Sequence, residues 1–283
     1  MAPSKADDTF TEPAPTGRVG RIFARAALLT ALAGIGLVIG GLRGDAFQTV
    51  LGFAFYVFAV IAIKLDANET GARLPPHHDV ALDKRRGYQL AGASVATFIA
   101  SIAGLYLVLV VLSWPFEEWV VRTFLGPDDE PALPGGTLLR AVYAIETVAL
   151  GPAVEEVLFR GLMLHWWARR WGVRRAVLTS ALLFGALHLD PLGSTLFALV
   201  ATALYMSFGT LLAPIVFHAM WNCSVTVLTA FPQPGAPEAE SIASFRSSWP
   251  WALGALVAAL GLLRVTLRSL RPVEGWVLPS RRR

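Results

Sequence analysis

The sequence has little charge and almost no cysteine. Only 16% of its 283 residues are charged, against roughly 25% in an average soluble protein, whereas 55% are hydrophobic. Its single cysteine, Cys223, excludes an internal disulfide, a CxxC metal knuckle and a thiolate cluster, and its apolar neighbours predict a packed core residue. The chain has no HExxH motif, so a zincin-type metalloprotease is unsupported. The scarcity of charge indicates a membrane protein instead.

Long apolar runs recur along the whole chain. Several approach or exceed the roughly 20 residues that a helix needs to cross about 30 Å of hydrocarbon. We therefore predict an all-α fold, a polytopic transmembrane helical bundle of about eight spans. The predicted spans lie at about 26–42, 46–63, 88–114, 138–170, 176–189, 195–206, 211–231 and 249–263.

The two ends of the chain differ from this apolar body. Residues 1–19 are mostly polar and lack the basic segment and short apolar run of a signal peptide, so we predict a disordered cytoplasmic tail. Residues 272–283 are predicted to form a basic cytoplasmic tail. Residues 20–271 between them are predicted to form a single transmembrane helical domain.

The basic residues predict the orientation in the membrane. If the N-terminus is cytoplasmic, only Arg43, Arg122 and Arg246 fall in loops on the opposite side, although the chain has 24 lysines and arginines. By the positive-inside rule, this asymmetry favours cytoplasmic N- and C-termini. The same clustering between apolar runs accounts for the net charge of +4 without a nucleic-acid partner, so the predicted partner is the lipid bilayer.

Two adjacent carboxylates and an arginine lie within the largely apolar run from 141 to 167. Glu155, Glu156 and Arg160 lie inside the fourth predicted span, and charged residues in lipid are costly enough to be functional-site candidates. Glu156 and Arg160 are four residues apart, so they share a helix face and can pair. Glu155 points about 100° away and is free to face a cavity.

Two later spans carry polar residues with the same spacing. Phe184 and His188 are four residues apart, as are His218 and Asn222. At about 1.5 Å per residue, Glu155, His188 and Asn222 each lie roughly 20 Å from the predicted cytoplasmic end of their helix, and His218 lies roughly 13 Å from it. Allowing for helix tilt, we predict that they share one layer and form one buried polar site.

Such a group of side chains supports peptide hydrolysis without a serine or cysteine nucleophile. A carboxylate beside a histidine can take a proton from water and return it to a leaving amine. Histidine and asparagine donors can stabilise the oxyanion that forms on the attacked carbonyl. Alternatively, Glu155, His188 and His218 are a possible ligand set for a catalytic zinc ion, and the residues alone leave both routes open.

Taken together and in this order, the three motifs resemble those of the CPBP family of intramembrane proteases. This family includes the type II CAAX prenyl endopeptidases and bacterial abortive-infection and bacteriocin-processing relatives. The resemblance covers Glu155-Glu156-xxx-Arg160, Phe184-xxx-His188 and His218-xxx-Asn222, about a third of the chain. It implies a protease core at about 138–231.

The resemblance also implies a role for each residue. Glu155 would be the general base that activates water, and His188 would assist at the same water. His218 and Asn222 would form the oxyanion site, while Glu156 and Arg160 would orient it. Zinc is an optional cofactor in this interpretation.

The expected function is therefore an intramembrane endopeptidase acting on a membrane-associated protein or peptide. The Ala-, Arg- and Pro-rich composition favours a bacterial source and a multi-pass protein of the inner (plasma) membrane. The alternative is a membrane scaffold or binding protein that uses the same Glu, His and Asn cluster to hold a partner or lipid without catalysis.

Overall fold

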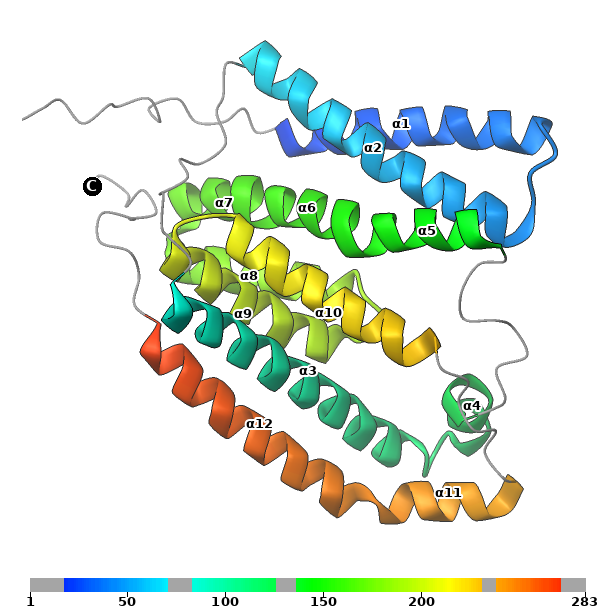
Figure 1. The fold of residues 1–283 in the computed structure, drawn as a ribbon, viewed down its shortest axis with the longest axis vertical. Helices are drawn as coiled ribbons and strands as arrows, with labels where there is room; N and C mark the ends of the chain where they lie inside the picture. The colour runs from blue at the N-terminus through cyan, green and yellow to red at the C-terminus, as the bar shows by residue number, and fades with distance from the viewer. Residues whose placement is uncertain (1–17, 71–82, 126–135, 231–237, 271–283) are drawn as a thin grey trace, which may run out of the picture.

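The structure is a computed structural model, and it describes residues 18–70, 83–125, 136–230 and 238–270. Within these ranges the chain is helical, with short turns and no strand. The prediction of an all-α membrane bundle is confirmed (Figure 1). The tail predicted for 272–283, and all but the last two residues of the one predicted for 1–19, fall outside the described residues.

The helices follow the predicted spans closely. The fourth span is continuous but changes its hydrogen-bond register twice, and short helices near the third and eighth spans were not predicted. The elements are α1 (Arg18–Ile39), α2 (Gly44–Thr70), α3 (Lys84–Leu112), α4 (Glu117–Val120), η1 (Val121–Leu125), α5 (Thr137–Ile145), η2 (Glu146–Leu150), α6 (Gly151–Glu156), η3 (Val157–Met163), α7 (Leu164–Trp171), α8 (Val173–Ala186), α9 (Pro191–Phe208), α10 (Leu212–Ala230), α11 (Glu238–Ser247) and α12 (Trp249–Ser269).

Six of the predicted spans correspond to helices that are long and apolar enough to cross a membrane. A seventh, α10, has a shorter apolar stretch at Leu212–Leu228. The eighth, α8, has only 14 residues and is about 21 Å long, which is less than a bilayer core of about 30 Å. The count of eight spans therefore stays a prediction, because α8 is too short to be counted as a membrane-crossing helix.

The fourth span contains two π-helical segments, η2 and η3, on either side of α6. In η2 the N–H of Gly151 bonds to the carbonyl of Glu146, five residues back, instead of to Thr147. The next residue is Pro152, which has no N–H and whose ring crowds the preceding turn of a regular helix. The wider π turn accommodates this proline, and it leaves the Thr147 carbonyl without its usual partner within the helix.

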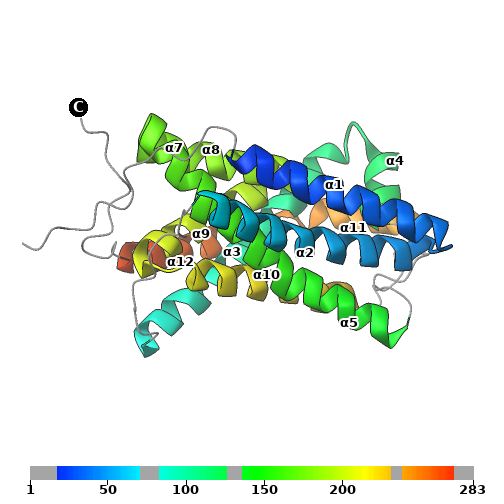
Figure 2. The same cartoon turned by 90° about the horizontal axis from the view of Figure 1, so that it is seen from above.

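The helices pack as layers around the fourth span (Figures 1 and 2). The α1–α2 hairpin lies along one side, where α2 contacts α5, η2 and α6. On the other side α8, α9 and α10 form the core, with Phe184, Tyr205 and Phe217 among its fully buried side chains. Helix α3 packs against α9 and α12 beyond it. The fourth span is thus covered on both sides at the level of its glutamates.

Cys223 is a correction. The apolar run predicts a core position, yet the Cys223 side chain is exposed on α10. A helix that is apolar on all sides gives no sign of which face meets lipid, so only the packing of α10 decides this.

The orientation can be tested by cysteine labelling. In a Cys223→Ser background, Arg43→Cys lies in the α1–α2 turn, and Arg175→Cys lies near the start of α8, at the opposite end of the bundle (Figure 1). In intact cells, a membrane-impermeant maleimide should label Arg43→Cys, and should label Arg175→Cys only after permeabilisation. The reverse pattern would contradict cytoplasmic termini.

Candidate active site

A buried ion pair forms the base of the site. Arg160 Nη1 donates to Glu156 Oε1 at 2.8 Å, as the spacing of four residues predicts. Both side chains are removed from the surface, with Glu156 0% and Arg160 1% exposed. Ions at such depth require both a counter-charge and further hydrogen bonds to offset lost solvation.

Neighbouring helices supply those further contacts. The other terminal nitrogen of Arg160 donates to the carbonyl of Ala198 on α9 at 3.1 Å. The guanidinium also lies over the ring of Phe184 on α8, 4.9 Å from its centroid, within the range of cation–π attraction. Glu156 Oε1 in turn lies 3.0 Å from Nδ1 of His218 on α10. The ion pair therefore connects α6 and η3 with α8, α9 and α10.

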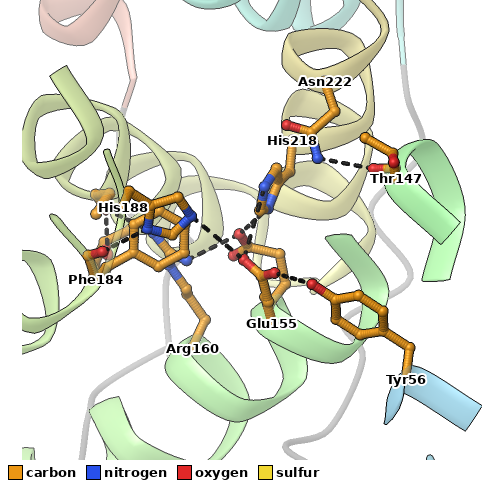
Figure 3. A network of polar contacts seen from close by, with 11 residues as sticks. Tyr56, Thr147, Glu155, Arg160, Phe184, His188, His218 and Asn222 are labelled. Carbon is orange, nitrogen blue, oxygen red and sulfur yellow. Dashed lines mark hydrogen bonds and ion pairs between the residues drawn. The ribbon is translucent and has the colours of Figure 1, made fainter. Parts of the chain in front are cut away.

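Glu155 faces a different set of groups, as the helical rotation predicts. One carboxylate oxygen, Oε1, accepts a hydrogen bond from the phenol of Tyr56 at 2.9 Å. The other, Oε2, lies 3.9 Å from Nε2 of His188 and 3.9 Å from Nε2 of His218 (Figure 3). Oε2 is buried and has no hydrogen-bond partner among the described residues. Three of the predicted site residues thus meet at a single carboxylate oxygen.

His188 reaches this place from a turn and not from a helix. The predicted fifth span extends to residue 189, but α8 ends at Ala186, and the N–H groups of Leu187 and His188 bond to carbonyls only three residues back. Pro191 begins α9, and Asp190 before it caps that helix by accepting from the N–H of Gly193 at 3.0 Å. Because a residue before proline is disfavoured in a helix, the chain turns here.

The hydrogen bonds of the two histidines fix which nitrogen faces Glu155. His188 Nδ1 lies 2.6 Å from the carbonyl of Phe184, and His218 Nδ1 lies 3.0 Å from the ion-paired carboxylate of Glu156. Both partners are acceptors, so each Nδ1 carries the hydrogen and donates it. The assignment rests on these partners. It leaves each neutral ring with an unprotonated Nε2 directed toward Glu155.

Aromatic rings hold both imidazoles in place. The ring of Phe184 stacks on that of His188 at 4.3 Å between centroids. Phe197 contacts His218 edge to face at 4.8 Å. Phe184, which the sequence singles out only by its spacing from His188, therefore packs between His188 and the Arg160 guanidinium (Figure 3).

Asn222 makes a contact that the sequence does not predict. Its amide nitrogen donates to the carbonyl of Thr147 at 2.8 Å, which joins α10 to η2 (Figure 3). This is the carbonyl that the π turn leaves without its usual partner. The contact explains how a side chain one turn beyond His218 fixes the distance between α10 and the glutamate helix.

The comparison with protein families agrees with this geometry. Residues 137–224 match the family described as type II CAAX prenyl endopeptidase Rce1-like. The chain carries an Rce1-like domain. Comparisons with curated proteins and with solved structures give no match. The Rce1-like domain runs from α5 into α10 and contains Glu155, Glu156, Arg160, His188, His218 and Asn222. With its long apolar helices, the protein is an integral membrane protein.

One residue at the site lies outside the Rce1-like domain. Tyr56 belongs to α2, and 99 positions separate it from the Glu155 that it contacts. Sequence reasoning missed it because an aromatic residue in an apolar span has an ordinary explanation in packing. Gly52 lies four residues earlier on the same face of the helix, and this small residue is the only sequence feature that indicates a close approach there.

The candidate zinc ligands do not fit a metal as they are arranged. With ligand distances of about 2.0–2.2 Å, tetrahedral geometry sets neighbouring ligand atoms about 3.3–3.6 Å apart. Glu155 Oε2 is 3.9 Å from Nε2 of His188 and from Nε2 of His218. Over the described ranges, no group of three or more His, Cys, Asp and Glu side chains is placed to hold a metal ion.

The ion pair makes a prediction about stability. Arg160→Met should lower the free energy of unfolding by about 3–5 kcal/mol, because it leaves the Glu156 carboxylate buried without its cation. Denaturant unfolding of the protein in detergent micelles measures this. The double variant Glu156→Gln/Arg160→Met should recover part of the loss.

The control is a pair of the same residue types and spacing at the surface. Arg122 and Glu118 are 3.7 Å apart and mostly exposed, so Arg122→Ala should leave the unfolding midpoint unchanged. If Arg160→Met also leaves the unfolding midpoint unchanged, the buried ion pair does not stabilise the fold as proposed.

Proposed function

We propose that the protein is an intramembrane endopeptidase in which Glu155 activates a water molecule for attack on a peptide bond. The observation that supports this most strongly is the position of Glu155 Oε2, buried, without a hydrogen-bond partner among the described residues, and equidistant from two imidazole Nε2 atoms. A water molecule roughly 2.8 Å from Oε2 and from Nε2 of His188 is compatible with their 3.9 Å separation. Both atoms are acceptors and can orient it.

The proposed reaction uses Glu155 as base and then as acid. Water gives one proton to Glu155 Oε2 while its oxygen attacks the substrate carbonyl, and His188 Nε2 accepts a hydrogen bond from the remaining O–H. The tetrahedral intermediate then collapses as the C–N bond breaks. Glu155 returns its proton to the leaving amine, so that the enzyme ends the cycle unchanged.

His218 and Asn222 are proposed to stabilise the oxyanion of that intermediate. Glu156 holds the Nδ1–H of His218, and its Nε2 faces the space beside Glu155. His218 donates to the oxyanion only in the form that carries a second hydrogen on Nε2. The Asn222 amide uses one N–H for Thr147 and retains a second. Glu156 and Arg160 orient the site without touching the substrate.

The proposed substrate is a membrane-associated protein or peptide. The less buried members of the site, Glu155 and His188, mark the side on which it opens, with side chains 22% and 37% exposed. Large apolar side chains beside His188 are strongly exposed, with Leu187 at 66% and Leu189 at 105%. This apolar surface beside the site suits a substrate chain that reaches it from the lipid. We also propose that residues 138–231 are the protease core and that the protein resides in a bacterial inner membrane.

Replacing the base tests this proposal. Glu155→Gln should reduce the cleavage rate by roughly 100-fold or more, because an amide cannot take the proton from water. As the substrate has to be identified, membranes of cells with the wild-type and Glu155→Gln proteins are compared by proteomics. The substrate should persist at full length in the variant.

The same variant discriminates the proposal from a non-catalytic scaffold. Glutamine keeps the size of Glu155 and its acceptor for the phenol of Tyr56, so a binding protein should retain its function. If the membrane peptides of wild-type and Glu155→Gln cells are the same, and the variant keeps its cellular function, the protease proposal is wrong.

Metal removal makes a separate test. The purified protein should cleave its substrate at the same rate after treatment with EDTA or 1,10-phenanthroline, because Glu155 activates water directly. If chelators abolish the activity and added zinc restores it, Glu155, His188 and His218 must move closer together than 3.9 Å to bind a metal, and the metal-free proposal is wrong.

A further inference from the structure

Tyr56 is a contact of Glu155 that the proposed reaction does not yet use. Its phenol donates to Glu155 Oε1 at 2.9 Å, and Figure 3 shows it reaching the carboxylate from the side opposite the two histidines. The residue comes from α2, which lies outside the Rce1-like domain at 137–224. The site thus includes a side chain from the N-terminal hairpin.

Two glycines allow α2 to come this close to the glutamate helix. A Cβ at Gly151 would lie 3.3 Å from Cζ and 3.4 Å from the hydroxyl oxygen of Tyr56, and 3.1 Å from the carbonyl of Glu146. A Cβ at Gly52, one turn before Tyr56, would overlap the carboxylate of Glu146. The phenol therefore lies directly against the backbone of α6, in the turn that precedes Glu155.

The hydrogen bond makes the two oxygens of Glu155 different. Oε1 is occupied by a neutral donor, and Oε2 is left directed toward Nε2 of His188 and of His218. Without such a hydrogen bond, the carboxylate can rotate about its Cγ–Cδ bond, and its two oxygens exchange places. Because hydrogen bonds to a charged group are among the stronger ones, a phenol is well suited to prevent that rotation.

We infer that Tyr56 is a positioning residue for Glu155, holding the carboxylate so that Oε2 is the oxygen that receives the proton of water. This inference rests on the proposed function of Glu155 as base. It assigns to the α1–α2 hairpin a part in catalysis that its packing alone would not require.

The test is removal of the hydroxyl alone. Phenylalanine fills the same space against Gly151, so Tyr56→Phe should fold normally and keep its KM, while kcat falls roughly 10- to 100-fold, as expected for loss of one hydrogen bond to a charged group. The probe is the substrate that persists in Glu155→Gln cells, presented in detergent micelles. Unchanged kcat would overturn the inference.

The matched control is another tyrosine of the bundle. Tyr106 on α3 donates its hydroxyl to the backbone carbonyl of Phe245 on α11, away from Glu155. Tyr106→Phe should leave kcat and KM unchanged. A similar fall in both variants would mean that kcat responds to the loss of any buried hydroxyl, and the inference would fail.

A double-mutant cycle separates positioning from general support of the fold. Glu155→Asp withdraws the carboxylate by about 1.5 Å, one bond length, beyond reach of the phenol. Tyr56→Phe should then cost less than about twofold in this background, because the hydrogen bond is already lost. An equal cost in both backgrounds would contradict a role through Glu155.

If Glu155→Gln is itself fully active, the proposed function fails; if only Tyr56→Phe is fully active, this inference alone fails.

Discussion

The arrangement of the site depends on the buried ion pair between Glu156 and Arg160. Its two charges lie 2.8 Å apart with almost no exposure, so neither is tolerable without the other. Arg160 also bonds to the carbonyl of Ala198, and Glu156 also contacts His218. Because those groups belong to α9 and α10, satisfying the pair also sets where these helices lie. It gives Glu156 a cation and leaves Glu155 without a basic partner of its own on the helix.

The proline after Gly151 imposes a second constraint. It favours a π turn in which the Gly151 N–H bonds to Glu146, and the Thr147 carbonyl becomes available to Asn222. The glycine beside it admits the phenol of Tyr56. A single irregular turn thus receives α10 on one side and α2 on the other, immediately before the two glutamates.

Short α8 adds the third element. At 14 residues it ends before it could cross a bilayer, and the turn that follows carries His188 to Glu155. The stacking of His188 on Phe184 and its bond to the Phe184 carbonyl hold the turn against the bundle.

Much of this was available from the sequence, because length and spacing along a helix are local properties. Apolar run lengths located the helices, the interval of four residues paired Glu156 with Arg160, and depth counting brought Glu155, His188 and His218 to one layer. The rest depends on rotation about helix axes and on neighbours distant in the chain. The end of α8 had a local signal in Pro191. Packing alone decided that Cys223 faces outward, that Asn222 bonds to Thr147 and that Tyr56 reaches Glu155, since an apolar sequence in lipid carries no mark of which neighbour each face will meet.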